Sequence, residues 1–258
     1  MYLTDAKVRK LHLEVSEAYN MSPLAIEDGW RYTPNEFSIL ELKTILKYLP
    51  DRDSIFLDIG TGRGIVPIFI KKLGIRSISV DSFAVSGVSA IKNVNRFGVE
   101  GYLCEVGREM IPIESGSVDC VLIADVIEHL IHSPKPILNE IHRLLKPDGV
   151  CVATTPNATR LTVRLKVLLG YSNWANIYEY FDEESHFGHH HEYSMAEFKE
   201  VFRRTKFKIE DSIMYEDNLR TVNIKSLCDA GTRNRSRDKR IDEATLITAG
   251  KKLLLDPL

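Results

Sequence analysis

One stretch of ten residues decides the fold of this chain: IFLDIGTGRG, residues 55–64. A short apolar run leads into a loop with three glycines, and an apolar helical segment follows. Glycine lets the backbone turn sharply and approach a ligand closely at the N-terminus of a helix. A nicotinamide dinucleotide site would need its third glycine at the position of Ile65. Asp58, two residues before the first glycine, would repel a pyrophosphate and attract a sulfonium or an amino group.

Strand-like and helix-like segments alternate around this loop. Strands separated by helices predict an α/β fold with a parallel sheet and right-handed crossovers. A helix at 195–204 and two further strands at 207–215 and 244–250 predict an antiparallel ending. The expected parallel strands span 54–59, 77–80, 101–104, 118–124 and 150–155, and the expected helices between them span 65–73, 84–97 and 135–145.

Two segments flank or interrupt this pattern. Apolar residues recur at helical spacing in residues 1–50, which predicts an N-terminal helical extension or lid ahead of a main domain at 51–258. Residues 157–192 are rich in aromatic residues and histidine, and they predict an insertion over the carboxyl edge of the sheet. Open α/β sheets bind their ligands at that edge.

Composition excludes several classes of protein. The 258 residues carry a formal net charge of −2, so no global basic field indicates nucleic acid as the partner. No apolar run is long enough to span a bilayer, and the charged N-terminus lacks a signal-peptide core. The four cysteines are not spaced as zinc ligands and are expected to be buried thiols. We therefore expect a cytoplasmic protein without a membrane partner.

An acid also ends the second expected strand. Asp81 is followed by Ser82, about twenty residues after the glycine loop. A carboxylate at this place in a βαβ unit accepts hydrogen bonds from both hydroxyls of a ribose. The two loops together predict a site for a ligand with a ribose and a cationic group.

Four motifs carry a resemblance to a known family: LDIGTGRG (57–64), SVDS (79–82), SVDCVLIADVIEHL (117–130) and IHRLLKPDGVCVATTPN (141–157). Together they resemble the class I S-adenosylmethionine (SAM)-dependent methyltransferases. The resemblance covers about residues 50–215 and is greatest to the branch of ubiquinone-biosynthesis, sugar and natural-product O-methyltransferases. It implies a Rossmann-like, seven-stranded, mostly parallel sheet with an antiparallel final strand and helices on both faces.

The resemblance also implies the residues that bind SAM. Asp58, Gly60 and Gly62 would contact its methionine end, Asp81 its ribose, and Ala124 and Asp125 would lie beside the methionine. Relatives usually contact the adenine with an acidic residue about five positions before a proline that aligns with Pro112. In this chain that position is Gly107. Glu105 lies close by, but it is out of register with the acid of the relatives. Adenine binding is therefore expected to use backbone groups around Val106 and Gly107. The remaining expected contacts are Thr61, Gly64 and Ser82.

An acid–histidine cluster is the candidate for chemistry. If Asp125 begins a helix, Glu128 and His129 share its face at the carboxyl edge of the sheet. Relatives use such a pair as a catalytic base or as ligands of a divalent metal. The run HFGHHH at 186–191 adds His189 and His191 as candidates, since imidazole suits proton transfer and metal binding. A base favours a hydroxyl acceptor, so we expect O-methylation of a small polar or saccharide-like molecule.

Two alternatives remain at this point. Metal-dependent small-RNA 2′-O-methyltransferases show a similar order of motifs, although their first acid is usually glutamate where this chain has Asp125. The basic tract at 231–241 would then contact phosphates. The other alternative is a binding subunit with the SAM fold and no turnover. The sequence does not specify the oligomeric state.

Overall fold

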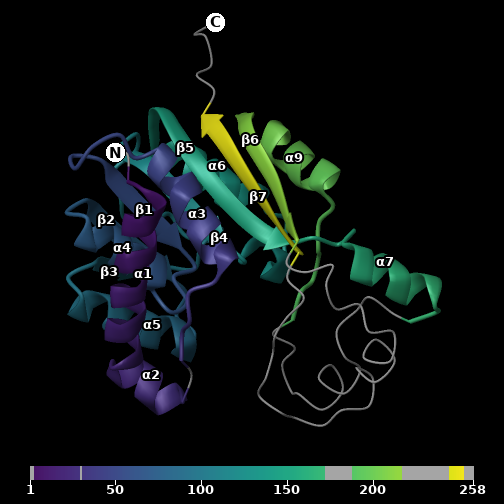
Figure 1. Cartoon of the computed structure of the whole chain (residues 1–258). Coiled ribbons are helices and arrows are strands. Elements are labelled where there is room, and N and C mark those ends of the chain that lie inside the picture. The colour runs from purple at the N-terminus through teal and green to yellow at the C-terminus, as the bar shows by residue number, and fades with distance from the viewer. Residues whose placement is uncertain (1–2, 30, 172–187, 217–243, 253–258) are drawn as a thin grey trace, which may run out of the picture.

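A seven-stranded sheet forms the centre of the molecule (Figure 1). The computed structural model describes residues 3–29, 31–171, 188–216 and 244–252. The strand order is β3-β2-β1-β4-β5-β7-β6. Strand β7 runs in the opposite direction to the other six strands. This confirms the predicted Rossmann-like fold and its antiparallel final strand. The strands are β1 (Ile55–Ile59), β2 (Arg76–Asp81), β3 (Glu100–Leu103), β4 (Val118–Ala124), β5 (Leu145–Pro156), β6 (Phe207–Glu216) and β7 (Ala244–Lys252).

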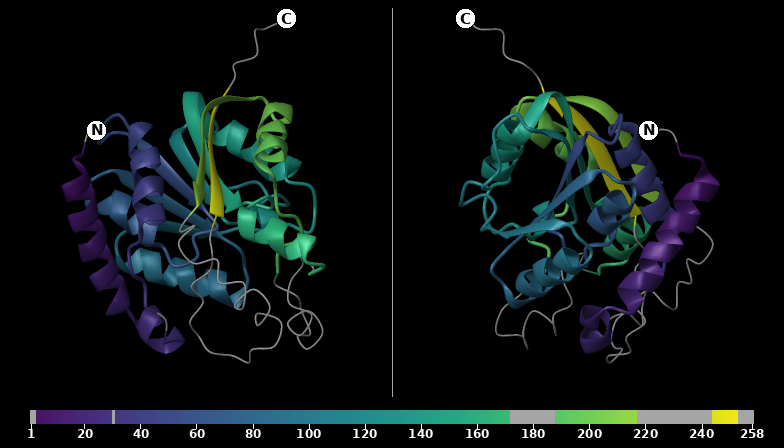
Figure 2. Two further views of the ribbon diagram at one scale, coloured as in Figure 1. Left: turned by 45° about the vertical axis from the view of Figure 1, so that its right-hand side comes forward. Right: turned by 90° about the vertical axis from the view of Figure 1, so that its left-hand side faces the viewer.

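Helices cover both faces of the sheet, as predicted (Figure 2). Alternate residues of β1 show why: Phe56 is buried in the core on one face, and Leu57 is buried in the core on the other. The first core contains α1 (Asp5–Asn20), α2 (Pro23–Asp28), α3 (Glu36–Lys47), α4 (Ile65–Lys72) and α5 (Val85–Arg96). The second contains α6 (Lys135–Leu144) and α9 (Met195–Arg204).

The N-terminal extension is packed onto the first face. Val8 and Val15 of α1 and Leu42 and Ile45 of α3 are fully buried in the same core as β1. The Phe37 and Tyr215 rings lie 5.5 Å apart at the ends of α3 and β6. Helix α3 therefore begins near the carboxyl edge of the sheet and runs across it.

Two local expectations are wrong. β5 begins at Leu145 rather than 150, because Leu145 pairs with Val118 and a bulge precedes Val150. Asp125 does not begin an α-helix, because its φ of 51° is left-handed and only a three-residue 3₁₀ helix, η1 (Ile127–His129), follows.

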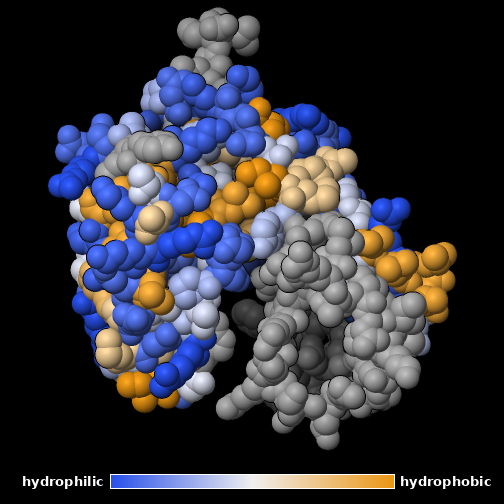
Figure 3. Space-filling view, in the orientation of Figure 1, coloured by the Kyte–Doolittle hydropathy of each residue, from blue (hydrophilic) through white to orange (hydrophobic). Residues whose placement is uncertain are grey.

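The expected insertion contains α7 (Leu161–Leu168), whose exposed apolar side chains are visible as the orange patch at the right of Figure 3. Part of that insertion, residues 172–187, and the basic tract at 231–241 lie outside the described residues. Cys104, Cys120 and Cys151 are buried free thiols, as expected. No described helix is long and apolar enough to cross a membrane.

Candidate active site

The glycine loop joins β1 to α4 at the point where the strand order reverses between β1 and β4. Gly60, Gly62 and Gly64 all have positive φ, which L-residues with side chains rarely adopt. A Cβ on Gly60 would lie 2.2 Å from Val126, and one on Gly64 would lie 2.2 Å from Val94. A Cβ on Gly62 would approach only the Gly60 carbonyl oxygen, at 3.9 Å, among the described residues. Two glycines are thus required for packing, and the third leaves open space for a ligand.

Asp81 connects this loop to the next one. Its Oδ2 accepts a hydrogen bond from Gly62 N at 3.0 Å, and its Oδ1 accepts one from Ser82 N at 2.7 Å. The carboxylate at the end of β2 therefore lies beside the glycine loop, which is where the sequence predicts the ribose.

Glu105, which sequence reasoning set aside as out of register, follows β3 after one residue. Its Oε1 accepts a hydrogen bond from Phe83 N at 3.1 Å, so this carboxylate lies beside the loop that follows β2. Val106 forms a bridge with Glu109, and Gly107 takes a φ of 84°. This turn lies between Glu105 and Pro112, so a longer turn here would account for the shifted register of the acid.

Three carboxyl groups with raised pKa values belong to the site: Asp58 and Glu41 are buried, whereas Asp125 is exposed. Burial and the charge of Asp81 raise the pKa of Asp58 to about 7. Desolvation by the surrounding protein also raises the pKa of Asp125, whose Oδ1 accepts a hydrogen bond from Thr154 Oγ1 at 3.1 Å. The third is Glu41 of α3, whose pKa rises to about 8 through burial and repulsion by Asp125 and Asp58. Sequence reasoning missed Glu41, although an acid within an apolar helical stripe was a visible signal.

Glu128 is the most enclosed acid of the cluster, with no exposed surface. Its Oε2 accepts a hydrogen bond from Thr155 Oγ1 at 3.2 Å, while Oε1 has no hydrogen-bond partner among the described residues. Burial and the nearby charge of Asp125 raise the pKa of Glu128 to about 8. A buried acceptor without a donor is costly, so this oxygen is suited to a proton or a cation.

The histidine-rich segment lies directly over η1. The backbone N–H groups of His190 and His191 both donate to the Glu128 carbonyl, at 2.7 and 3.2 Å. The carbonyl of Gly188 lies 3.2 Å from His129 Nδ1. Tertiary contacts therefore bring two segments about sixty residues apart in sequence to the same place at the carboxyl edge.

His189 completes the cluster, and His191 does not. The His129 and His189 rings lie 4.8 Å apart, edge to face. Glu128, His129 and His189 each offer one ligand atom, and these atoms lie within 4.8 Å of one another. His191 instead packs its ring against Tyr193, with centroids 4.5 Å apart. A hydrogen bond to Glu192 raises the pKa of His189, whereas burial and the His189 charge lower the pKa of His129.

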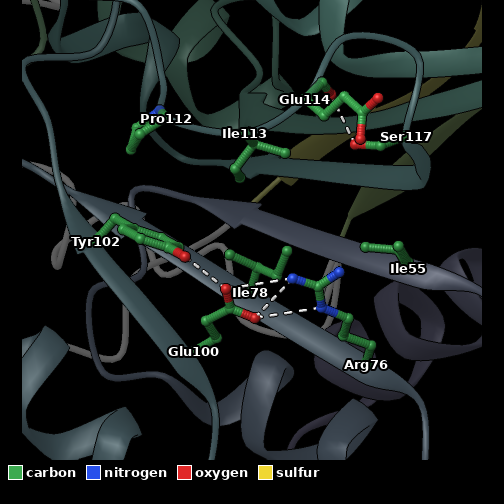
Figure 4. Close-up of a pocket in the computed structure, with 9 residues that line it drawn as sticks. All are labelled: Ile55, Arg76, Ile78, Glu100, Tyr102, Pro112, Ile113, Glu114 and Ser117. Carbon is green, nitrogen blue, oxygen red and sulfur yellow. Dashed lines mark hydrogen bonds and ion pairs between the residues drawn. The ribbon is translucent and has the colours of Figure 1, made fainter.

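A separate cavity lies at the opposite edge of the sheet (Figure 4). Its polar groups satisfy one another, since Arg76 donates to both oxygens of Glu100 and Tyr102 Oη donates to Glu100 Oε1. Ile55 and Arg76 begin their strands, so this cavity is at the amino edge, far from the glycine loop. It belongs to the architecture of the sheet rather than to the candidate site.

The strand order, the antiparallel β7 and the loop between β1 and α4 define the class I SAM-dependent methyltransferase fold. The profile of a family described as "Methyltransferase domain" matches residues 30–212, so the chain belongs to that family.

Curated relatives are more distant. The ubiquinone biosynthesis O-methyltransferase of Maricaulis maris is 30% identical over 113 residues, covering 43% of this chain and 44% of that protein. The malonyl-[acyl-carrier protein] O-methyltransferase of a Marinomonas species is 24% identical over 159 residues, covering 58% and 56%. The chain thus spans about half the length of the curated relatives it matches.

Solved structures share the fold at low sequence identity. The 1,6-didemethyltoxoflavin-N1-methyltransferase of Burkholderia thailandensis, bound to 1,6-didemethyltoxoflavin and S-adenosylhomocysteine, is 17% identical with a TM-score of 0.57. That likeness covers 98% of this chain and 92% of the other. A geranyl diphosphate methyltransferase in complex with SAM is 14% identical with a TM-score of 0.52, covering 83% and 85%.

Proposed function

We propose that this protein transfers the methyl group of SAM to a hydroxyl group of a small polar or saccharide-like acceptor. The observation that carries this proposal is Glu128, a fully buried acid whose Oε1 is unpaired among the described residues, within a cluster with His129 and His189. A hydroxyl must lose its proton during methylation, and this cluster offers groups that can take it. The two curated relatives described above are also named O-methyltransferases, which supports an oxygen acceptor.

The cofactor would lie across the β1 and β2 loops. Because Gly62 has no side chain, the cofactor could come close to the backbone of the loop there. Asp81 would accept hydrogen bonds from the ribose hydroxyls. Asp58 and Asp125 would face the positive methionine end: the buried carboxyl group of Asp58 needs a cation or a proton, and Asp125 follows the neighbouring strand β4 directly. Glu105 would accept a hydrogen bond from the adenine amine, beside Phe83.

The chemical step is an in-line displacement. The acceptor oxygen attacks the methyl carbon, the carbon–sulfur bond breaks, and S-adenosylhomocysteine leaves with the electron pair. Alignment of the reactants contributes roughly 7–11 kcal/mol to such reactions. The proton of the hydroxyl passes to the cluster, and a general base of this kind contributes about 10²–10⁴-fold.

The same cluster fits a divalent cation. Glu128, His129 and His189 would hold it, because one carboxylate and two imidazoles are ordinary ligands of zinc and other transition metals. A bound cation would lower the pKa of an acceptor hydroxyl, which would make the hydroxyl a better nucleophile. The unpaired Oε1 of Glu128 supports this assignment.

A methyl-release assay tests the proposal. The protein would be offered panels of sugars, phenols and RNA 3′ ends with SAM, with and without Mg²⁺, Mn²⁺ or Zn²⁺. We expect turnover on a hydroxyl-bearing small molecule. Turnover on RNA alone would instead support the 2′-O-methyltransferase alternative. SAM binding without turnover on any acceptor would support a non-catalytic subunit.

A further inference from the structure

His189 is carried by a segment that the backbone alone already fixes in place. His190 N and His191 N donate to the Glu128 carbonyl, and Ala158 N donates to the Tyr193 carbonyl at 3.0 Å. Asn157 and Tyr193 also form a β-bridge. None of these contacts uses the side chain of Glu192. These backbone contacts would remain if the side chain of Glu192 were removed.

The orientation of the His189 ring, in contrast, depends on Glu192. His189 Nδ1 lies 2.9 Å from Glu192 Oε1. The other oxygen, Oε2, is 3.4 Å from Arg160 Nη1, and that nitrogen also donates to the Asn157 carbonyl at 3.2 Å. The side chains of Glu192 and Arg160 are only 17% and 21% exposed. Glu192 is thus a largely buried carboxylate between a histidine and an arginine.

This contact sets which nitrogen of the ring carries hydrogen. A neutral imidazole has one donor and one acceptor nitrogen, while an ionised carboxylate only accepts. In the neutral ring, Nδ1 of His189 would therefore carry the hydrogen that Glu192 receives, and Nε2 would keep its lone pair. Neutral histidine in water places its hydrogen mainly on the other nitrogen, so Glu192 reverses an intrinsic preference.

We propose that Glu192 is a positioning residue that holds His189 in the Nδ1–H tautomer, with the Nε2 lone pair directed into the cluster with Glu128 and His129. The proposal rests on the proposed function, because it assigns Glu192 a part in the same site. A lone pair at Nε2 is what a proton acceptor or a metal ligand requires, and orienting carboxylates of this kind typically change activity or metal affinity by about 10–100-fold.

Selective ¹⁵N labelling of histidine tests the tautomer without any assay of activity. Long-range ¹H–¹⁵N correlation of the full chain, at a pH where the ring is neutral, separates the two nitrogens, and His189→Ala identifies its signals. We expect the Nδ1–H form in the wild type and in Glu192→Gln, since the amide oxygen still accepts. We expect Glu192→Ala to shift His189 toward the Nε2–H form. A wild-type ring in the Nε2–H form would overturn the proposal.

Kinetics supply the second readout. Glu192→Ala should lower kcat about 10–100-fold with SAM affinity unchanged, and Glu192→Gln should restore part of that loss. Glu200→Ala is the matched control, because Glu200 also binds arginine but lies on the exposed side of α9. If His189→Ala lowers kcat and Glu192→Ala does not, the positioning role is wrong while the proposed function stands. If Glu128→Ala and His189→Ala both leave kcat unchanged, the proposed function itself has failed.

Discussion

At the scale of single residues, the three loop glycines have different tasks although all have positive φ. Gly60 and Gly64 are required because a Cβ would overlap Val126 or Val94. Gly62 has no such neighbour among the described residues, so only its backbone conformation and a ligand restrict the position. Substitution can therefore separate a ligand-binding glycine from two structural glycines.

Gly62→Val should abolish SAM binding and leave the protein folded, since the side chain would enter the space of the cofactor. The φ of 51° adds strain of roughly 1–2 kcal/mol. Gly116→Val is the matched control, because Gly116 also has a positive φ and no described atom lies within 4 Å of the place its Cβ would take. Calorimetric titration should show SAM binding only in the Gly116 variant. Unchanged affinity in Gly62→Val would show that the loop is only a turn.

Glu128 and His129 should serve the chemical step. Glu128→Gln and His129→Ala should each lower kcat by about 10²–10⁴-fold with little change in SAM affinity. His132→Ala is a suitable control, because His132 binds Arg108 at the surface. If the cluster holds a metal, a chelator should reproduce these losses and added metal should reverse the chelator effect. Wild-type rates in both variants on the true acceptor would contradict a role in chemistry.

At the scale of elements, α3 links the N-terminal extension to the candidate site. Its apolar residues pack on the sheet, and Glu41 is buried among them near Asp58 and Asp125. Because the pKa of Glu41 is raised from 4.5 to about 8, the folded protein holds a proton there that the unfolded chain has lost. Burial of Glu41 therefore lowers the free energy of unfolding progressively as the pH rises from 4.5 to about 8.

Glu41→Gln should stabilise the SAM-free protein at pH 8 and have almost no effect at pH 4. The gain should be at least about 1 kcal/mol, since one pKa unit corresponds to about 1.4 kcal/mol. Urea unfolding at both pH values measures it. Glu36→Gln, on the exposed end of the same helix, is the control, and it should show no such gain at pH 8. An equal effect of Glu41→Gln at both pH values would mean that folding does not raise the pKa of Glu41.

At the scale of the whole molecule, the candidate cofactor site draws on β1, β2, β3, β4 and α3. A ligand that contacts so many elements only in the folded state stabilises the entire fold. Saturation at a hundred times Kd adds about 2.7 kcal/mol to the free energy of unfolding.

SAM or S-adenosylhomocysteine at that concentration should raise Tm by about 5–10 °C, given the size of the chain. Asp81→Ala should reduce the shift, because it removes the carboxylate expected at the ribose. Differential scanning fluorimetry measures both effects. A shift with NAD and none with SAM would contradict the assignment of the cofactor.

The sequence by itself determined the parallel sheet, the glycine loop and the acids at or next to the carboxyl ends of β1 and β2. These features are local, because strand periodicity, glycine spacing and an acid at a strand end all depend on neighbours in the chain. The tertiary structure alone decided that His189 joins Glu128 and His129 while His191 packs on Tyr193. The segment that carries both histidines is irregular and their partners come from distant segments, so spacing cannot choose between them. For the same reason the partners of Glu41, Glu105 and Glu192 became visible only once the strands and helices were packed together.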